Sequence, residues 1–166
     1  MKCEKYKLKE KYDYRRFKSL GDYVAKIAEE KKVSRTEAKK IAYREIPLEK
    51  AYQTKILDAL RREFPDGRFR KVAQGFGSVS GEPDLDGVMG GKYIAIEVKR
   101  PLVGDPTELQ KKAVRQIRQA GGCAMIASYP DEVVAAVYAY VNREPYWYEL
   151  TGCTEAVAEG DGEVLE

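Results

Sequence analysis

The first part of the chain repeats its apolar side chains at the spacing of an α-helix. This period predicts one helix over residues 22–31 and a second from about residue 35 to residue 45. Ser34 followed by Glu37 is a capping-box pattern, which marks the start of the second helix. Because proline is tolerated in the first turn of a helix, we expect Pro47 to begin a third helix. Its apolar stripe consists of Leu48, Tyr52, Ile56, Leu57 and Leu60.

The middle of the chain changes to the alternating period of β-strands. Short strands are predicted over residues 69–72 and 84–88, and a stronger one over residues 92–99. Gly90 and Gly91 between the last two are a typical two-residue hairpin turn. Alternation in the third strand divides it into two faces: Ile94, Ile96 and Val98 on one, and Tyr93, Ala95, Glu97 and Lys99 on the other.

A β–α–β pattern follows the hairpin. Asp105, Pro106 and Glu108 predict a helix start, and we expect Leu109, Ala113, Ile117 and Ala120 to face inward. Gly121 and Gly122 end this helix, and a buried strand over residues 123–128 comes next. A helix crossover implies that this strand pairs in parallel with the strand before it. A last helix over residues 131–140 and an edge strand over residues 146–150 complete the pattern. The predicted fold class is α/β, a small mixed β-sheet flanked by helices, with a helical N-terminal appendage.

Three segments are predicted, which are a basic helical appendage (residues 1–46), a core (residues 47–150) and an acidic tail (residues 151–166). The tail contains five acids and no base, and residues 1–50 contain sixteen Lys and Arg against nine Asp and Glu. A basic front half suits a polyanionic partner, although a solvated helical surface explains it equally. Aromatic side chains among the cations of residues 1–20 suit either base stacking or packing onto the domain, and both interpretations stay open.

The two N-terminal helices have two interpretations. A short helical pair joined by a tight turn is typical of a DNA-reading helix-turn-helix and also of a plain helical hairpin. Lys32 stands where the first motif usually has glycine, and Ala38 stands where a branched residue is expected. Both interpretations are kept.

Composition limits the available chemistry. The chain contains no histidine, which excludes a histidine base and any histidine-ligated zinc site. Its three cysteines show no zinc or disulfide pattern. No apolar run approaches the length of a membrane span and no secretory signal is visible, so we expect a cytoplasmic protein without a membrane partner. Hard cations such as Mg²⁺ need only oxygen ligands, and they stay compatible with this composition.

Two carboxylates converge on the predicted hairpin. Asp84 begins it and Glu97 lies close by across the ladder, an arrangement that is costly unless a cation or a proton fills the space. We expect Asp84, Glu97 and the backbone carbonyl of Val98 to hold a divalent metal, with Lys99 beside them. Lys99 then either orients the attacking water and neutralises charge on the phosphate, or forms an ion pair with Glu97. Gln74 and Ser78, in the glycine-rich loop before the hairpin, are candidates for contact with a nucleic-acid backbone. Arg100 and the basic residues of the following helix are expected to be solvated or to contact phosphates.

The combination of these motifs resembles a known family. Gly-Glu-Pro-Asp-Leu, the hairpin, Ile-Glu-Val-Lys-Arg-Pro, then Gln110 and Ala-Gly-Gly are similar to the PD-(D/E)XK nuclease superfamily, and within it to the VRR-NUC family, over roughly residues 47–129. The resemblance implies a restriction-endonuclease-like core that cleaves DNA with Mg²⁺ or Mn²⁺, often with structure selectivity for branched DNA, and that tends to form homodimers.

The resemblance also assigns residues. It implies that Asp84 and Glu97 are metal ligands, that Lys99 is the catalytic lysine and that Gln110 is the glutamine of the next helix. It matches Glu49 to the acid of the first core helix, with Glu45 as the alternative; Pro47 between them favours Glu49. Two other functions stay open, which are a non-catalytic DNA-binding protein that uses the basic N-terminal helices and a metal-free interaction module.

Overall fold

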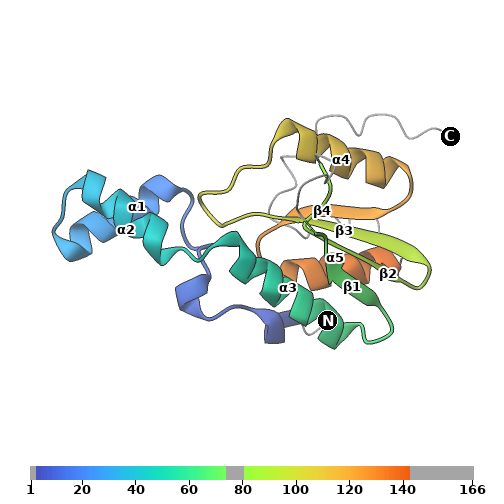
Figure 1. Ribbon diagram of the computed structural model, residues 1–166. Coiled ribbons are helices and arrows are strands. Elements are labelled where there is room, and N and C mark those ends of the chain that lie inside the picture. The colour runs from blue at the N-terminus through green and yellow to red at the C-terminus, as the bar shows by residue number, and fades with distance from the viewer. Residues whose placement is uncertain (1–2, 74–80, 143–166) are drawn as a thin grey trace.

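The computed structural model describes residues 3–73 and 81–142 (Figure 1). Its centre is a four-stranded sheet in the order β1-β2-β3-β4, with bounds β1 Arg68–Lys71, β2 Leu85–Met89, β3 Lys92–Val98 and β4 Cys123–Ala127. The pairs β1–β2 and β2–β3 are antiparallel, and β3–β4 is parallel. The predicted small mixed sheet of an α/β fold is therefore confirmed.

Helices cover both faces of the sheet. The helices α3 (Glu49–Glu63) and α5 (Pro130–Val141) lie on one side, and α4 (Glu108–Gln119) lies on the other (Figure 1). Alternation along β3 decides which helix each side chain meets. Ala95 packs with Val114 of α4, and Glu97 shares the face of Ala95. The main core on the opposite face includes Ile94, Ile96 and Val98 of β3 with Tyr52, Ile56 and Leu60 of α3.

The hairpin between β2 and β3 has the predicted turn. Gly90 and Gly91 both have positive φ angles, 56° and 75°. This left-handed backbone matches the twist of the two flanking strands and costs glycine little. The turn sets the register in which Leu85 pairs with Ile96.

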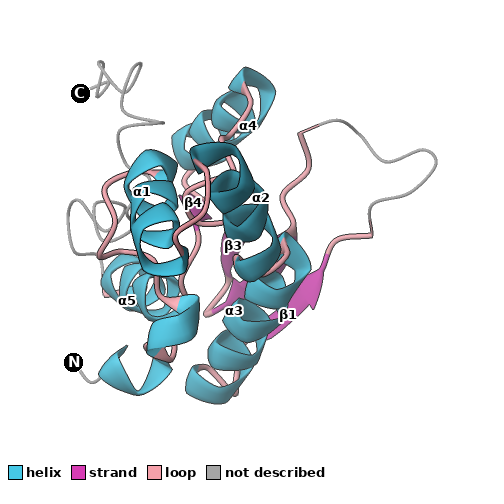
Figure 2. Cartoon of the chain, turned by 90° about the vertical axis from the view of Figure 1, so that its left-hand side faces the viewer, coloured by secondary structure: helices cyan, strands magenta, loops and turns pink. Residues whose placement is uncertain are grey.

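The N-terminal helices form a hairpin of their own. The helices α1 (Leu20–Lys31) and α2 (Arg35–Glu45) lie side by side and project from the sheet (Figures 1 and 2). Ser34 accepts a hydrogen bond from the amide of Glu37, as the capping pattern predicts. Lys32 ends α1 in the left-handed region, with φ 52°, where a glycine is usual. A second core fills the space between the helices; it consists of Tyr14, Tyr23, Val24, Ile27, Ala38, Ala42 and Ile46.

The chain before α1 lies along the helices of the main core. Two short 3-10 turns, η1 (Cys3–Tyr6) and η2 (Glu10–Tyr12), belong to it. Tyr6 is buried in the main core, where its hydroxyl donates to Glu63 at 2.5 Å. Tyr14 is buried in the second core. Of the two interpretations of the aromatic residues in this segment, packing onto the domain therefore holds for Tyr6 and Tyr14.

Two predicted helix starts are wrong. Pro47 lies before α3, and Leu48, which is 70% exposed, is the N-cap residue. The carbonyl of Pro47 accepts a hydrogen bond from Arg100 instead of from an amide of the helix. The helix α4 begins at Glu108 with Thr107 as its cap, rather than at Asp105.

The late start of α4 has a local cause. Thr107 and Gln110 form a reciprocal capping box that satisfies two amides at the helix start. The inward face also differs from the expected one: Val114 is the buried residue of α4, where it packs with Ala95, and Leu109, which we expected to face inward, is 45% exposed. Ala120 is exposed as well, and Ala113 and Ile117 are half-buried.

Some of the remaining predictions are confirmed, and others lie outside the described residues. The helices over residues 22–31, 35–45 and 131–140 and the strand over residues 123–128 are confirmed within a few residues. The predicted edge strand 146–150, the acidic tail and the loop residues Gln74 and Ser78 lie outside the described residues. Across residues 3–73 and 81–142, every helix is too short or too polar to cross a bilayer.

Candidate functional site

The antiparallel pairing of β2 and β3 brings Asp84 and Glu97 together. Because Leu85 is opposite Ile96, the next step along the ladder sets Asp84 against Glu97. Asp84 is held from two sides: its carbonyl accepts from the amide of Val72 at 2.9 Å, and its Oδ2 accepts from the amide of Val98 at 2.8 Å. Both carboxylates are buried, with exposed fractions of 7% and 3%. The expected closeness across the ladder is therefore present.

Lys99 follows β3 directly and lies beside Glu97. Its Nζ donates to Oε1 of Glu97 at 2.7 Å, and its side chain is also buried. The backbone amide of Lys99 donates to the carbonyl of Ala127 at 3.0 Å, which continues the parallel ladder with β4. The ion pair that we considered as one role of Lys99 is thus present, and the sheet holds both partners in place.

Gln110 of α4 reaches the same carboxylate. Its Nε2 donates to Oε1 of Glu97 at 2.5 Å, and its Oε1 accepts from the amide of Thr107 at 2.9 Å. One side chain therefore caps α4 and contacts Glu97. The Thr-x-x-Gln spacing is a sequence signal for the capping role, whereas the contact with Glu97 depends on how α4 packs on the sheet.

Glu49 occupies the first position of α3 and faces the site. It is half-buried, and burial raises its pKa, as does the charge of Asp84, whereas Lys99 and the backbone amide of Arg100 act in the opposite direction. Glu45, the alternative acid, lies on α2, where it accepts from the hydroxyl of Tyr23 at 2.6 Å and pairs with Lys31. The structure therefore brings Glu49, and not Glu45, toward Asp84 and Lys99.

Burial dominates the electrostatics of this site. It raises the pKa of Glu97 to about 7; the hydrogen bond from Lys99 limits the rise, and the charges of Asp84 and Glu49 add to it. Burial also raises the pKa of Asp84, which the hydrogen bond from the Val98 amide and the charge of Lys99 oppose. Carboxylates that resist ionisation in this way are stabilised by a nearby cation.

The donor set suits a hard cation. Asp84, Glu97 and Glu49 offer carboxylate oxygens, the ligands that Mg²⁺ and Mn²⁺ prefer. Throughout the described ranges, however, no three acidic or cysteine side chains are gathered closely enough to form a complete metal site. The arrangement thus fits a cation held by two carboxylates with water in the other positions, a coordination that Mg²⁺ commonly has. The amide of Val98 bonds Asp84, and a ligand role for its carbonyl stays a prediction.

Arg100 has a role that the sequence analysis missed. Its guanidinium donates to the carbonyls of Tyr43, Ile46 and Pro47, at 3.1, 2.7 and 3.0 Å. These groups lie where α2 ends and α3 is about to begin. Arg100 therefore connects the N-terminal hairpin to the strand that carries Glu97, in place of the solvated or phosphate-contacting role that we expected. Only the folded chain shows this, since the partners lie more than fifty residues away in sequence.

Comparisons with known proteins add one structural similarity. No protein-family model matches the chain, and no curated protein matches it. A solved structure described as "VRR_NUC domain" is similar over 54% of this chain and 97% of its own, with 21% sequence identity and a TM-score of 0.44. The function is therefore argued from the residues of the site.

Proposed function

We propose that the protein is an endonuclease that hydrolyses DNA phosphodiester bonds with Mg²⁺ or Mn²⁺. The observation that supports this most is the buried group of Asp84, Glu97 and Lys99 at one end of the central strands. Two converging carboxylates next to an ammonium group are suited to a divalent cation and a phosphate together. The motif resemblance of this hairpin to PD-(D/E)XK nucleases supports the same reaction.

The carboxylates have the ligand role in this proposal. Asp84 and Glu97, with the carbonyl of Val98, hold the cation, and Glu49 completes the negative side of the site. A bound divalent cation supplies polarisation of the phosphate and a more acidic water. Asp84 is well suited to this role because the amide of Val72 holds its backbone and the amide of Val98 holds its carboxylate before any ligand binds.

Lys99 and Gln110 act on the same oxygen of Glu97. In the proposal, Lys99 is the catalytic lysine, whose ammonium orients the attacking water or neutralises the charge that develops on the phosphate. Gln110 is a positioning residue, because its Nε2 and the Nζ of Lys99 both donate to Oε1 of Glu97. Both donors fix the rotation of the Glu97 carboxylate, so its orientation is set before the substrate binds.

A cleavage panel tests this proposal. End-labelled linear duplex, flap and four-way DNA are incubated with Mg²⁺, Mn²⁺ or EDTA, and an RNA strand is included. We expect metal-dependent cuts within the strands, strongest on branched substrates, and none in EDTA. Salt-sensitive binding with no cleavage of any substrate would contradict the nuclease and favour a DNA-binding protein that uses its basic helices. Light scattering with and without DNA tests the homodimer that the family resemblance implies.

A further inference from the structure

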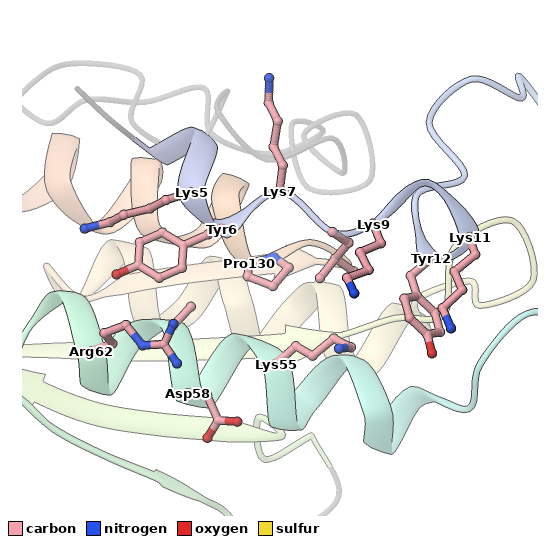
Figure 3. Close-up of a pocket in the computed structure, with 12 residues that line it drawn as sticks. Lys5, Tyr6, Lys7, Lys9, Lys11, Tyr12, Lys55, Asp58, Arg62 and Pro130 are labelled. Atoms are coloured by element: carbon pink, nitrogen blue, oxygen red, sulfur yellow. The ribbon is translucent and has the colours of Figure 1, made fainter.

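A basic pocket lies on α3, away from the carboxylate site. It has a volume of about 550 Å³ and is formed between the N-terminal segment and the outer side of α3 (Figure 3). Among the lining side chains that the structure describes, Asp58 is the one acid. Six cations line it: Lys5, Lys7, Lys9, Lys11, Lys55 and Arg62. A concave surface with one sign of charge concentrates the field and attracts an anion.

Tyr12 organises the cations at one end of this pocket. The Nζ of Lys11 lies 4.8 Å from the centre of its ring, and the Nζ of Lys55 lies 5.0 Å from the same centre. Each ammonium group is attracted to the negative face of the ring. Figure 3 shows Lys9 pointing toward Lys55, whereas Lys7 points away from α3. The ring of Tyr12 therefore has two ammonium groups close to it, and Lys9 points toward one of them.

Four of these cations have no acidic partner among the residues that the structure describes. At the other end of the pocket, Lys5 pairs with Glu63 at 2.5 Å, which fastens the N-terminal segment to α3. Among the side chains that the structure describes, no carboxylate forms an ion pair with Lys9, Lys11, Lys55 or Arg62. The carboxylate of Asp58 lines the pocket with them, but the cations outnumber it. Like charges held together repel each other, and an external anion relieves that repulsion.

The pocket follows α3 toward the turn that carries Glu49. Lys55 and Arg62 are seven residues apart, which is about 10 Å along a helix, and their side of α3 is turned by about 120° from the side of Glu49. The hydroxyl of Tyr52 donates to the carbonyl of Tyr12 at 3.4 Å. The Tyr12 end of the pocket thus lies beside the first turns of α3, the helix that begins with Glu49.

We propose that this pocket holds consecutive backbone phosphates of the DNA strand that the carboxylate site cuts. The proposal rests on the proposed function for the identity of the strand. A length of about 10 Å covers about three nucleotides at roughly 3.4 Å each. Because the ammonium groups of two lysines already lie within 5.0 Å of the ring centre of Tyr12, we expect phosphates rather than a stacked base beside it. The pocket is therefore suited to phosphates, without preference for a DNA sequence.

Binding in EDTA tests this without depending on cleavage. Anisotropy of a labelled single-stranded oligonucleotide is measured between about 50 and 200 mM salt for the parent and for Lys9→Gln/Lys55→Gln. Loss of two phosphate contacts should lower the slope of log affinity against log salt by about 1.4. Over this range the parent then loses about sevenfold more affinity than the variant. The matched control Lys18→Gln/Arg68→Gln removes the same charge from exposed positions outside the pocket and should keep the slope of the parent.

Other outcomes would overturn the proposal. The proposal fails if Lys9→Gln/Lys55→Gln binds with the slope and affinity of the parent. It also fails if the oligonucleotide does not protect Lys9 and Lys55 from acetylation relative to Lys18. Competition by a deoxynucleoside triphosphate as strong as that by the oligonucleotide would assign the pocket to a free nucleotide instead. If the double variant does not fold, each single variant should lower the slope by about 0.7.

The pocket and the nuclease can fail separately. An oligonucleotide that binds through Lys9 and Lys55 but is never cut with Mg²⁺ or Mn²⁺ contradicts the proposed function and leaves a DNA-binding pocket. Metal-dependent cleavage with unchanged binding by Lys9→Gln/Lys55→Gln contradicts the pocket and leaves the nuclease.

Discussion

The Nζ of Lys99 lies 2.7 Å from Oε1 of Glu97, and 8% and 3% of these two residues are exposed. Because little water reaches the pair, each charge is stabilised mainly by the other. A buried ion pair of this kind is weak evidence of stabilisation, because the cost of removing both charges from water offsets their attraction. Its position beside Asp84 fits the proposed site for a cation and a phosphate.

Substitution of Lys99 tests its catalytic role. We expect Lys99→Gln to reduce cleavage at least about 100-fold, the loss typical when one donor to the developing charge is removed. The fold should persist, because Glu97 without its ammonium partner takes up a proton. Cleavage rates and circular dichroism measure the two effects, with Lys112→Gln on the exposed side of α4 as the matched control. Parent-like cleavage by Lys99→Gln would show that the site is elsewhere.

Glu97 should make the metal-free protein less stable as the pH rises from mild acid to neutral. Its pKa is raised from 4.5 to about 7, so between these values the folded state holds a proton that the unfolded state has released. The contribution is fully present below about pH 4.5 and is lost by about pH 7, on the order of 3 kcal/mol. Urea unfolding of the parent and of Glu97→Gln in EDTA measures it, since carboxylates away from this site cancel in the comparison. Identical pH profiles would contradict the assignment.

A divalent cation should reverse this pH dependence. A metal held by Asp84 and Glu97 competes with the proton on Glu97, so Mn²⁺ should raise the melting temperature more at pH 8 than at pH 6. At a concentration of about 100 times its dissociation constant, the stabilisation is about 2.7 kcal/mol. Thermal melts and titration calorimetry measure both quantities. Asp84→Asn should lose the effect, and an unchanged response in that variant would remove Asp84 from the metal site.

Two substitutions of Gln110 separate its capping role from its contact with Glu97. Gln110→Ala removes both and should lower the free energy of unfolding by about 1 kcal/mol. Gln110→Glu keeps an oxygen that accepts from Thr107 but places a negative charge beside Glu97. We expect it to retain most of the stability yet to reduce cleavage about 10-fold or more. If both variants cleave DNA as fast as the parent, the role of Gln110 is limited to capping α4.

Arg100 should hold the N-terminal hairpin against the core. Arg100→Met leaves the carbonyls of Tyr43, Ile46 and Pro47 without their charged donor. We expect a loss of about 2 kcal/mol, in the range of a charged hydrogen bond. Hydrogen exchange should speed up more in α1 and α2 than in the sheet. The exposed Arg68→Met is the matched control, and equal exchange in both variants would contradict the tether.

Much of the core was predictable because its signals are local. The alternation of β3 depends on neighbouring residues, and the hairpin turn depends on two glycines, so the opposed positions of Asp84 and Glu97 followed from the pattern. The start of α4 was harder. Asp105 and Thr107 both precede good helix formers, and a pattern alone does not decide between two caps. The reciprocal bonds of Thr107 and Gln110 decide it, because they satisfy more amides at the helix start.

The sequence by itself determined the order of the elements, the mixed sheet and the side of β3 that carries Glu97 and Lys99. These features follow from the periodicity of each segment and from the order of strands and helices along the chain. Only the tertiary structure decided that Arg100 connects two parts of the chain, that Gln110 reaches Glu97 and that Lys11 and Lys55 share the ring of Tyr12. These contacts join segments from distant parts of the chain, and packing of the helices on the sheet sets their distances. The periodicity within one segment therefore does not predict such a distance.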